Sequence, residues 1–356
     1  MHARWLFRCQ NGARRPAEDR DQHMPNPGRA SHTTQQDVAA RAGVSRGLVS
    51  LALKGEGRMS DGTRRRILDT ARALDYHPNT AAAELAARRS HRLAVVLPYL
   101  DNPFFDRLLR RLRHHAGVAG HTLVVLVSDL EDQLERTTVD EVLSMRPAGL
   151  ILPGTSMSPE ALLAMSERIP LCVLDRALDE PSIPTVRLDE ADAAWQIVAH
   201  LAAQGLRRLV FFSPPRSMHE SLLDERRAAC REAATDAGLD LTEVVRGDDM
   251  NETLAALRSD SKDPFGAVVY NDMLGIDLVA AVLASRLRPG ADVAIVSYDN
   301  TSLASRPEVS LTSVDQSPDR LAEAAVAAVL APAPAAHVTV PATLVVRASS
   351  LRTPRG

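Results

Sequence analysis

Residues 34–53, which read TQQDVAARAGVSRGLVSLAL, contain the first group of side chains along the chain with an evident binding chemistry. Two short segments with apolar residues at helical spacing meet there at Gly43. The second segment begins with Arg46 and brings Ser50 and Lys54 to the same side one and two helical turns later. Such groups on the exposed start of a helix suit the major groove of DNA. The pattern therefore predicts a helix-turn-helix that binds DNA.

Two packed helices would have to position these groups. Their shared seam is predicted from Val38, Ala39 and Ala42 on the first helix and Val44, Val49 and Leu53 on the second. Gly43 can end the first helix in a left-handed conformation, and Ser45 can cap the second through its hydroxyl. A third helix is expected in the segment RRRILDTARALDYHPN, whose apolar residues recur at helical spacing before Pro78. For residues 34–53 alone, an ordinary helical hairpin is the open alternative.

Charge is unevenly distributed along the chain. Residues 33–92 contain eleven Lys or Arg against six Asp or Glu, a net charge of +5, whereas the whole chain of 356 residues carries −3 and the remainder therefore −8. A basic segment attached to an acidic body is typical of a protein that binds phosphate with one end only. A solvated surface without that role is the alternative.

The remaining global features indicate a cytoplasmic protein. The three cysteines, Cys9, Cys172 and Cys230, are too scattered for a disulfide framework or a metal-binding pair. No apolar run reaches the length of a membrane span, and the first residues lack the apolar core of a signal peptide. Residues 1–32 are expected to be a disordered arm and residues 348–356 a tail.

From Leu93 onward, short aliphatic runs such as LAVVL, GLILP and VAIVSY alternate with amphipathic segments. This alternation predicts an α/β body with parallel sheets covered by helices on both faces, and its length suggests two similar lobes. Ligands of such folds bind at the carboxyl ends of the strands, so the loops just after the runs are the candidate site.

An enzyme and an exported solute-binding protein are the alternatives from other classes. The sequence has no GxGxxG after a strand, no GxxxxGK[ST], no HExxH and no GxSxG. A solute-binding or sugar-processing protein would have no use for a DNA-binding head. We therefore expect no catalytic residue, no metal and no cofactor.

Several motifs in order resemble the LacI (lac repressor, LacI-GalR) family of bacterial transcription regulators. They are DVAARAGVSRGLVS, SDGTRRRILDTARALDYHPN, DNPFF, VLDR, YND, VAIVSYDN and LTSVDQS. The resemblance covers about residues 33–347. It implies an all-α helix-turn-helix domain (33–78), a hinge helix (79–91) and an effector-binding and dimerisation domain (92–347) like a two-lobed periplasmic binding protein. The lobes are expected at 92–187 with 300–331 and at 188–299 with 332–347.

The resemblance also assigns the DNA contacts. Base-reading positions fall on Arg46, Gly47 and Leu51, of which Arg46 could pair with a guanine while Leu51 offers only apolar contact. Positions near the phosphates fall on Thr34, Ser45, Ser50, Lys54, Arg58 and Thr63. For Ser45 and Thr63, simple helix capping is an equal alternative. Leu85 stands where relatives wedge a leucine into the minor groove at the operator centre, with packing of a linker as the alternative.

Residues of the effector site are predicted at the ends of strands. By resemblance they are Phe104, Phe105, Asp175, Arg226, Asn271 and Asp299, together with Asp249 in the place where several relatives carry an aromatic ring. Asn102 caps the helix that Pro103 begins, and Asp272 is expected to cap a later helix. Because the aromatic ring is absent and RLAGY of relatives is RRAAC here, the effector can be a sugar, a related polar metabolite or a cation.

The resemblance therefore predicts a repressor that binds a palindromic operator as a dimer under control of a small effector. The C-terminus has no leucine heptads, so a dimer is the simplest assembly. The identity of the effector and the sign of its action are left open by the sequence.

Overall fold

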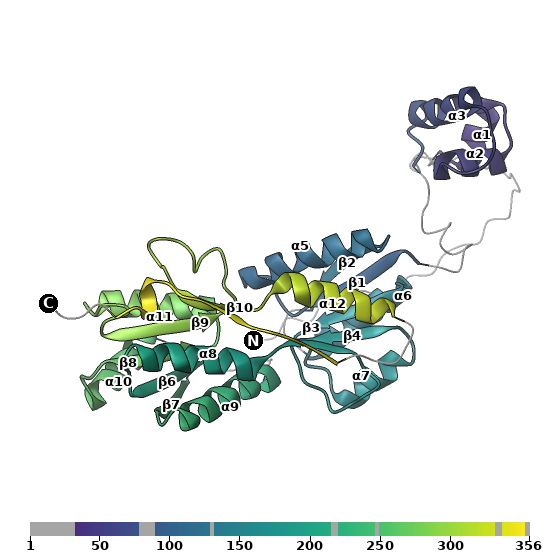
Figure 1. Cartoon of the computed structure of the whole chain (residues 1–356). Coiled ribbons are helices and arrows are strands. Elements are labelled where there is room, and N and C mark those ends of the chain that lie inside the picture. The colour runs from purple at the N-terminus through teal and green to yellow at the C-terminus, as the bar shows by residue number, and fades with distance from the viewer. Residues whose placement is uncertain are drawn as a thin grey trace, which may run out of the picture. The chain divides into compact units, whose positions relative to one another are not determined.

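The computed structural model describes residues 33–77, 90–128, 132–214, 220–245, 249–331 and 337–352. The chain divides into two compact units, Met1–Ala83 and Glu84–Gly356 (Figure 1). The predicted arm, residues 79–89 of the predicted hinge and Leu85 lie outside the described residues. Within the described part, no helix combines the length and apolar character needed to cross a membrane.

The first unit contains three helices, α1 (Gln35–Ala42), α2 (Arg46–Lys54) and α3 (Asp61–Ala73). Their core consists of Val38, Ala39, Ala42, Val49, Ala52, Ile67 and Ala71, with Val44, Leu48, Leu53 and Leu74 packed against it. The apolar spacing of each helix thus produces one shared seam. The helix-turn-helix prediction is confirmed.

Local capping fixes the ends of these helices. Thr34 and Asp37 form a reciprocal capping box at the start of α1, and Gly43 ends that helix with φ 65° and ψ 41°. Ser45 Oγ accepts from the backbone N–H of Leu48 at 3.3 Å and so caps α2. Because each cap satisfies a backbone N–H that a helix start leaves unpaired, the tight turn between α1 and α2 follows from a few local residues.

The second unit is built on two six-stranded sheets, each in its own lobe (Figure 1). The first lobe has the strand order β11-β5-β4-β3-β1-β2. Its strands are β1 (Arg92–Leu97), β2 (Thr122–Val127), β3 (Gly149–Pro153), β4 (Leu171–Leu174), β5 (Thr185–Leu188) and β11 (His337–Val340), and all pair in parallel. Helices α5 (Pro103–Val118) and α12 (Pro318–Leu330) cover one face, and α6 (Asp132–Ser144) and α7 (Pro159–Ser166) the other.

The second lobe has the order β12-β10-β9-β8-β6-β7. Its strands are β6 (Arg208–Ser213), β7 (Asp240–Val245), β8 (Phe265–Val269), β9 (Val293–Tyr298), β10 (Thr312–Asp315) and β12 (Thr343–Val345), of which β12 runs antiparallel to β10. Its helices are α8 (Glu190–Ala203), α9 (Glu220–Asp236), α10 (Met250–Asp260) and α11 (Asp272–Ala284), and the short 3₁₀ helix η1 (Ala348–Ser350) follows β12. Residues 348–350, expected in the tail, are therefore part of this lobe, where the hydroxyls of Ser349 and Ser350 bond to β9 and β10. Strands β8 and β9 are buried along their whole length, as expected for parallel strands between two helical layers.

The division into lobes differs from the expected one. Strand β10 pairs with β9 and so belongs to the second lobe, whereas residues 300–331 were all expected in the first. Strand β11 pairs with β5 and belongs to the first lobe, whereas residues 332–347 were all expected in the second. Among the described residues, the chain therefore changes lobe after β5, after β10 and after β11. Short strands of like composition do not reveal their pairing partners, so the crossing points could not be located from sequence.

Gly149 shows how closely α12 packs on the sheet of the first lobe. A Cβ at this position would lie 2.6 Å from Cγ2 of Val329 on α12. Such a distance is well inside van der Waals contact, so only glycine lets the helix approach β3 at this point. This packing holds α12 against the lobe at whose strand ends the candidate cleft opens.

Candidate functional site

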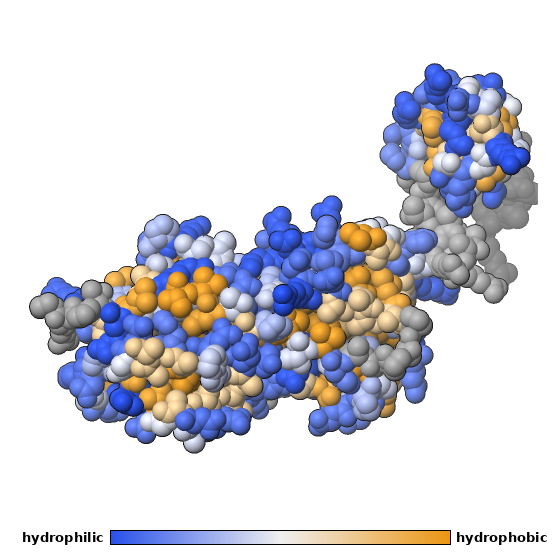
Figure 2. Space-filling view, in the orientation of Figure 1, coloured by the Kyte–Doolittle hydropathy of each residue, from blue (hydrophilic) through white to orange (hydrophobic). Residues whose placement is uncertain are grey.

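The exposed side of α2 carries the residues predicted to contact DNA. Arg46, Gly47 and Lys54 are exposed, Ser50 is half-buried and the Leu51 side chain is 38% exposed. All five lie on the side away from Val49 and Ala52, which are in the core. In the view of Figure 2 the first unit presents mainly hydrophilic residues. The helix can therefore offer a guanidinium, a hydroxyl and an ammonium to DNA without unpacking.

The remaining predicted contacts flank this helix, and three of them already have structural partners. Thr34 and Ser45 cap α1 and α2, and Thr63 Oγ1 lies 2.9 Å from the hydroxyl of Ser60, which caps α3. Arg58 is exposed in the loop between α2 and α3. Capping does not prevent a hydroxyl from also approaching a phosphate, because its second lone pair remains available.

Leu51 has a packing role besides any role at a base. A Cβ added to Gly57, which has φ +80°, would lie 3.0 Å from Cδ1 of Leu51. The side chain of Arg64 donates to the carbonyl oxygens of Glu56 and Gly57 at 3.3 and 3.2 Å. The loop after α2 is therefore held from two sides, by the Leu51 side chain and by an arginine from α3.

The second candidate site is a cleft between the two lobes of the second unit. Its cavity volume is about 30 Å³, and it is partly open to solvent. The first lobe contributes Tyr99, Asn102, Phe104, Phe105, Gly154 and Asp175, and the second contributes Leu222, Arg226, Tyr270, Asn271, Asp299 and Gln316. Most of these residues directly follow parallel strands, which is the usual ligand position in open α/β sheets. Aromatic rings with a few convergent polar groups suit the binding of a small molecule.

Six of the seven predicted effector residues line this cleft: Phe104, Phe105, Asp175, Arg226, Asn271 and Asp299. Asp249 is not among the lining residues. It is exposed and caps α10, where its carboxylate accepts from the backbone N–H of Asn251 at 2.7 Å. Asp249 was predicted to contact the effector, but in the structure its carboxylate serves as a helix cap. An aspartate just before a helix can accept from a backbone N–H of that helix.

Asp175 lies directly after β4 in the lining of the cleft. The residue is 7% exposed and has φ +59°, a conformation rare for a residue other than glycine. Its Oδ1 finds no hydrogen-bond partner in the part of the chain that the structure describes. Burial raises the pKa of the Asp175 carboxyl to about 7, although Arg226 acts in the opposite direction.

Asp299 connects the two lobes at the floor of the cleft. Its carboxylate accepts from Asn102 Nδ2 at 2.8 Å and from Gln316 Nε2. The same Asn102 caps α5 through its Oδ1, which accepts from the N–H of Phe104 at 2.9 Å. Burial raises the pKa of Asp299 to about 6. The predicted cap Asn102 is therefore also a bridge between lobes, since an amide has both an acceptor and a donor end.

Arg226 is already engaged by protein groups. Its Nε donates to Glu190 Oε1 at 3.1 Å and its Nη1 donates to the carbonyl oxygen of Tyr270 at 2.8 Å. The guanidinium carbon lies 4.1 Å from the ring centre of Tyr298. Arg226 and Glu190 are 2% and 5% exposed. Much of the hydrogen-bonding capacity predicted for an effector thus belongs to an internal ion pair.

The helix cap after β8 is Asn271 and not Asp272. Asn271 Oδ1 accepts from the N–H of Leu274 at 3.0 Å, while Asp272 is fully buried. The Asp272 carboxylate accepts from the Ser297 and Ser313 hydroxyls and from the N–H of Thr301. The prediction that Asp272 caps α11 is therefore wrong, because neighbouring strands supply stronger partners than its own helix.

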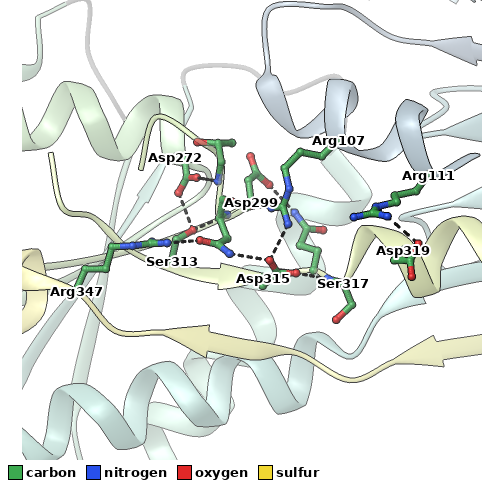
Figure 3. Close-up of polar contacts among 12 residues, drawn as sticks. Arg107, Arg111, Asp272, Asp299, Ser313, Asp315, Ser317, Asp319 and Arg347 are labelled. Carbon is green, nitrogen blue, oxygen red and sulfur yellow. Dashed lines mark hydrogen bonds and ion pairs between the residues drawn. The ribbon is translucent and has the colours of Figure 1, made fainter. Parts of the chain in front are cut away.

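Arg107 on α5 reaches across to the second lobe (Figure 3). Its Nη1 donates to the carbonyl oxygens of Asp299 and Asn300 at 2.8 and 2.6 Å, and its Nη2 lies 2.8 Å from Asp315 Oδ2. Asn300 is held in turn by the side chain of Arg347 at 2.6 Å. These contacts join the two lobes beside the cleft, so a change in lobe orientation must break or rearrange them.

Sequence reasoning missed Tyr99, Tyr270, Gln316 and Glu190. Tyr99 and Tyr270 lie at or near the ends of aliphatic runs and Gln316 lies in the motif LTSVDQS, and these positions were the available signal. Glu190 gives no signal because it lies 36 residues from its partner Arg226. Within the described ranges, no three His, Cys, Asp or Glu side chains converge as metal ligands would.

Comparison with known proteins identifies both parts of the chain. Residues 34–79 match the family model "Bacterial regulatory proteins, lacI family", and residues 198–350 match "Periplasmic binding protein-like domain". The regulator DegA of Bacillus subtilis is 26% identical over 299 residues, which cover 80% of this chain and 86% of that protein. The repressor CytR of Escherichia coli is 26% identical over 292 residues, covering 80% and 84%.

A solved structure supports the fold. The lac repressor dimer bound to operator and the anti-inducer ONPF superimposes with a TM-score of 0.78 at 23% identity, over 90% of this chain and 99% of that one. At this level of identity the likeness concerns the fold alone.

Proposed function

The chain belongs to the lacI family of bacterial regulatory proteins, and we propose that it represses transcription by binding a palindromic DNA operator as a dimer under control of a small molecule in the cleft. The observation that carries this proposal is the exposed start of α2, where Arg46 and Gly47 stand free of the helical core. Relatives of the same length are transcriptional regulators, so an enzymatic role has no support from them.

Arg46 is the base reader in this proposal. A guanidinium can donate two hydrogen bonds to O6 and N7 of a guanine, a contact that contributes about 1–3 kcal/mol of discrimination. Gly47 has no side chain, and Leu51 can contact only the methyl group of a thymine. Ser50, Lys54 and Arg58 would hold the backbone phosphates and so set the register of the helix.

Selection from a randomised duplex library tests the DNA proposal. The full chain should enrich a palindrome, and fluorescence anisotropy should then show binding to it that is much tighter than to a scrambled duplex at the same salt concentration. Enrichment of no sequence, or equal affinity for the scrambled duplex, would contradict sequence-specific binding.

Leu85 remains a prediction by family resemblance, because it lies outside the described residues. Two leucines from a dimer would be wedged into the minor groove at a deformable central step. Leu85→Ala should therefore weaken binding to the enriched palindrome far more than binding to unrelated DNA. Equal losses on both duplexes would refute the wedge.

The dimer is supported by the solved neighbour, whose structure is that of a dimer on its operator. Light scattering of the full chain should give twice the monomer mass of 38.6 kDa, and a tetramer or monomer would contradict the proposal. Each two-fold related half-site would then meet one helix-turn-helix.

Effector control is proposed to act through the lobes. A sugar or related polar metabolite in the cleft would contact residues of both lobes, including Asp175 and Asp299, and so favour one lobe orientation. Asp299→Ala should abolish the response of DNA binding to the effector while operator binding without effector is kept. Loss of both properties would indicate misfolding and would not support the coupling.

A further inference from the structure

The chemistry of the cleft restricts what it can hold. The main observation concerns Asp175, which lines the cleft and is 7% exposed. Its Oδ1 has no hydrogen-bond partner among the described residues. A buried acceptor without a donor costs about 1–3 kcal/mol, and more when it is charged. Asp175 is one of the residues that line the cavity, so a ligand bound there could supply the missing donor.

The charges around the cavity are unbalanced. Arg226 is the cation of the described lining, and Glu190 is its ion-pair partner at 3.1 Å. Asp299 receives its hydrogen bonds from two neutral amides, those of Asn102 and Gln316. Arg226 also favours the ionised forms of Asp175 and Asp299, so three carboxylates share this one cation when both aspartates are ionised. An anionic ligand would add to this repulsion.

Four aromatic residues also line the cavity. Phe104, Phe105 and Tyr99 come from the first lobe and Tyr270 from the second. The Tyr99 and Phe105 rings meet edge to face with centres 5.1 Å apart. Ring faces attract organic cations, and a cavity that combines them with carboxylates is the usual environment of a bound ammonium group. A bare metal ion fits poorly, because no group of three metal-ligating side chains is found among the described residues.

We propose that the cleft binds a small organic molecule that carries a protonated nitrogen, and that the Asp175 carboxylate is the partner of that nitrogen. This inference rests on the proposed role of the cleft as the effector site and narrows its ligand from polar metabolites in general to amines. A neutral polyol could also donate to Asp175, but it would leave the net negative charge of the cleft unchanged.

Calorimetric titration of the full chain with matched pairs tests the proposal. One pair is N-methyl-D-glucamine and D-glucitol, and the other is choline and its neutral isostere 3,3-dimethyl-1-butanol. At mildly alkaline pH, where Asp175 is ionised, at least one cation should bind at least about tenfold more tightly than its neutral partner, which corresponds to about 1.4 kcal/mol. Equal or tighter binding of the neutral partners overturns the proposal, as does failure of both cations to bind.

Variants separate the role of Asp175 from general effects. Asp175→Asn should remove the preference for the cation, whereas Asp175→Glu should keep it because the charge is retained. Asp319→Asn, a control on α12 outside the cavity lining, should change neither affinity. Thermal melting must show that each variant is folded. A preference that survives in Asp175→Asn overturns the proposal.

The DNA proposal fails or succeeds independently. Binding of the amines is measured without DNA, and operator binding is measured without amines. Operator binding without any amine preference would refute the amine proposal and leave the regulator proposal intact. An amine preference without operator binding would refute the regulator proposal and leave the amine proposal intact.

Discussion

Removing Glu190 should destabilise the second unit strongly, because it leaves the Arg226 guanidinium charged and buried. The two side chains are 2% and 5% exposed with 3.1 Å between Nε and Oε1. Breaking a buried pair from one side typically costs about 3–5 kcal/mol. The hydrogen bond to the Tyr270 carbonyl and the Tyr298 ring 4.1 Å away remain in Glu190→Ala, so we expect a loss of about 3 kcal/mol, at the lower end of that range.

Two other variants serve as comparisons for Glu190→Ala. The exposed pair of Arg111 and Asp319 has 3.7 Å between its atoms and side chains that are 56% and 57% exposed, so Asp319→Ala should cost at most about 1 kcal/mol. The double variant Glu190→Ala with Arg226→Met removes both charges and leaves an apolar chain in the same space. It should be more stable than Glu190→Ala alone, since the unpaired guanidinium charge of Arg226 is no longer buried.

Urea unfolding followed by tryptophan fluorescence measures these differences. Trp195 lies on α8, the helix that begins with Glu190, and is 65% exposed. The shift of the unfolding midpoint at constant slope gives the change in the free energy of unfolding. The reasoning is refuted if Glu190→Ala loses less than Asp319→Ala, or if the double variant is less stable than Glu190→Ala.

Three further predictions concern DNA, the lobe contacts and pH. Arg46→Ala should lower the free energy of binding to the selected palindrome by about 1–3 kcal/mol and relax preference at one base pair; an equal loss on unrelated DNA, in anisotropy titrations at fixed salt, would show a phosphate contact only. Arg107→Met should speed amide hydrogen exchange around residues 299–301 because it removes three hydrogen bonds between lobes, and the exposed Arg111→Met serves as its control; equal exchange in both variants would contradict a bridging role. Burial raises the folded pKa of Asp175 from 3.8 to about 7, so the ligand-free protein should lose up to about 4 kcal/mol of stability as pH rises from about 4 through 7. Asp175→Asn should flatten that part of the pH profile measured by urea unfolding, and an unchanged profile would count against the buried charge.

Much of the first unit was predictable because its determinants are local. The seam of α1 and α2, the left-handed Gly43 and the cap at Ser45 each depend on residues within a few positions of one another. Helical periodicity and capping act over the same short distances. The order of helices, and the side of α2 that faces solvent, follow from them.

The partners of charged side chains were not predictable in this way. Asp272 was expected to cap its helix, but Ser297 and Ser313 on β9 and β10 claim its carboxylate. Arg226 lines the cleft, as its predicted role requires, but its ion-pair partner Glu190 on another helix could not be foreseen. In both cases the partner of the charged side chain is distant in sequence and comes within hydrogen-bonding distance only in the folded protein.

By itself the sequence determined the helix-turn-helix, the two-sheet α/β body and the strand ends at which a cleft would open, because hydrophobic periodicity specifies which face of each element is buried. Only the tertiary structure shows where the chain crosses between the lobes, because β10 pairs with β9 and β11 pairs with β5. It also decided which polar groups remain for a ligand. Folding buries Asp175 without a donor for its Oδ1, whereas it gives Arg226 an ion-pair partner in Glu190. The free-energy cost of burying each charge depends on everything packed around it, which the sequence alone does not specify.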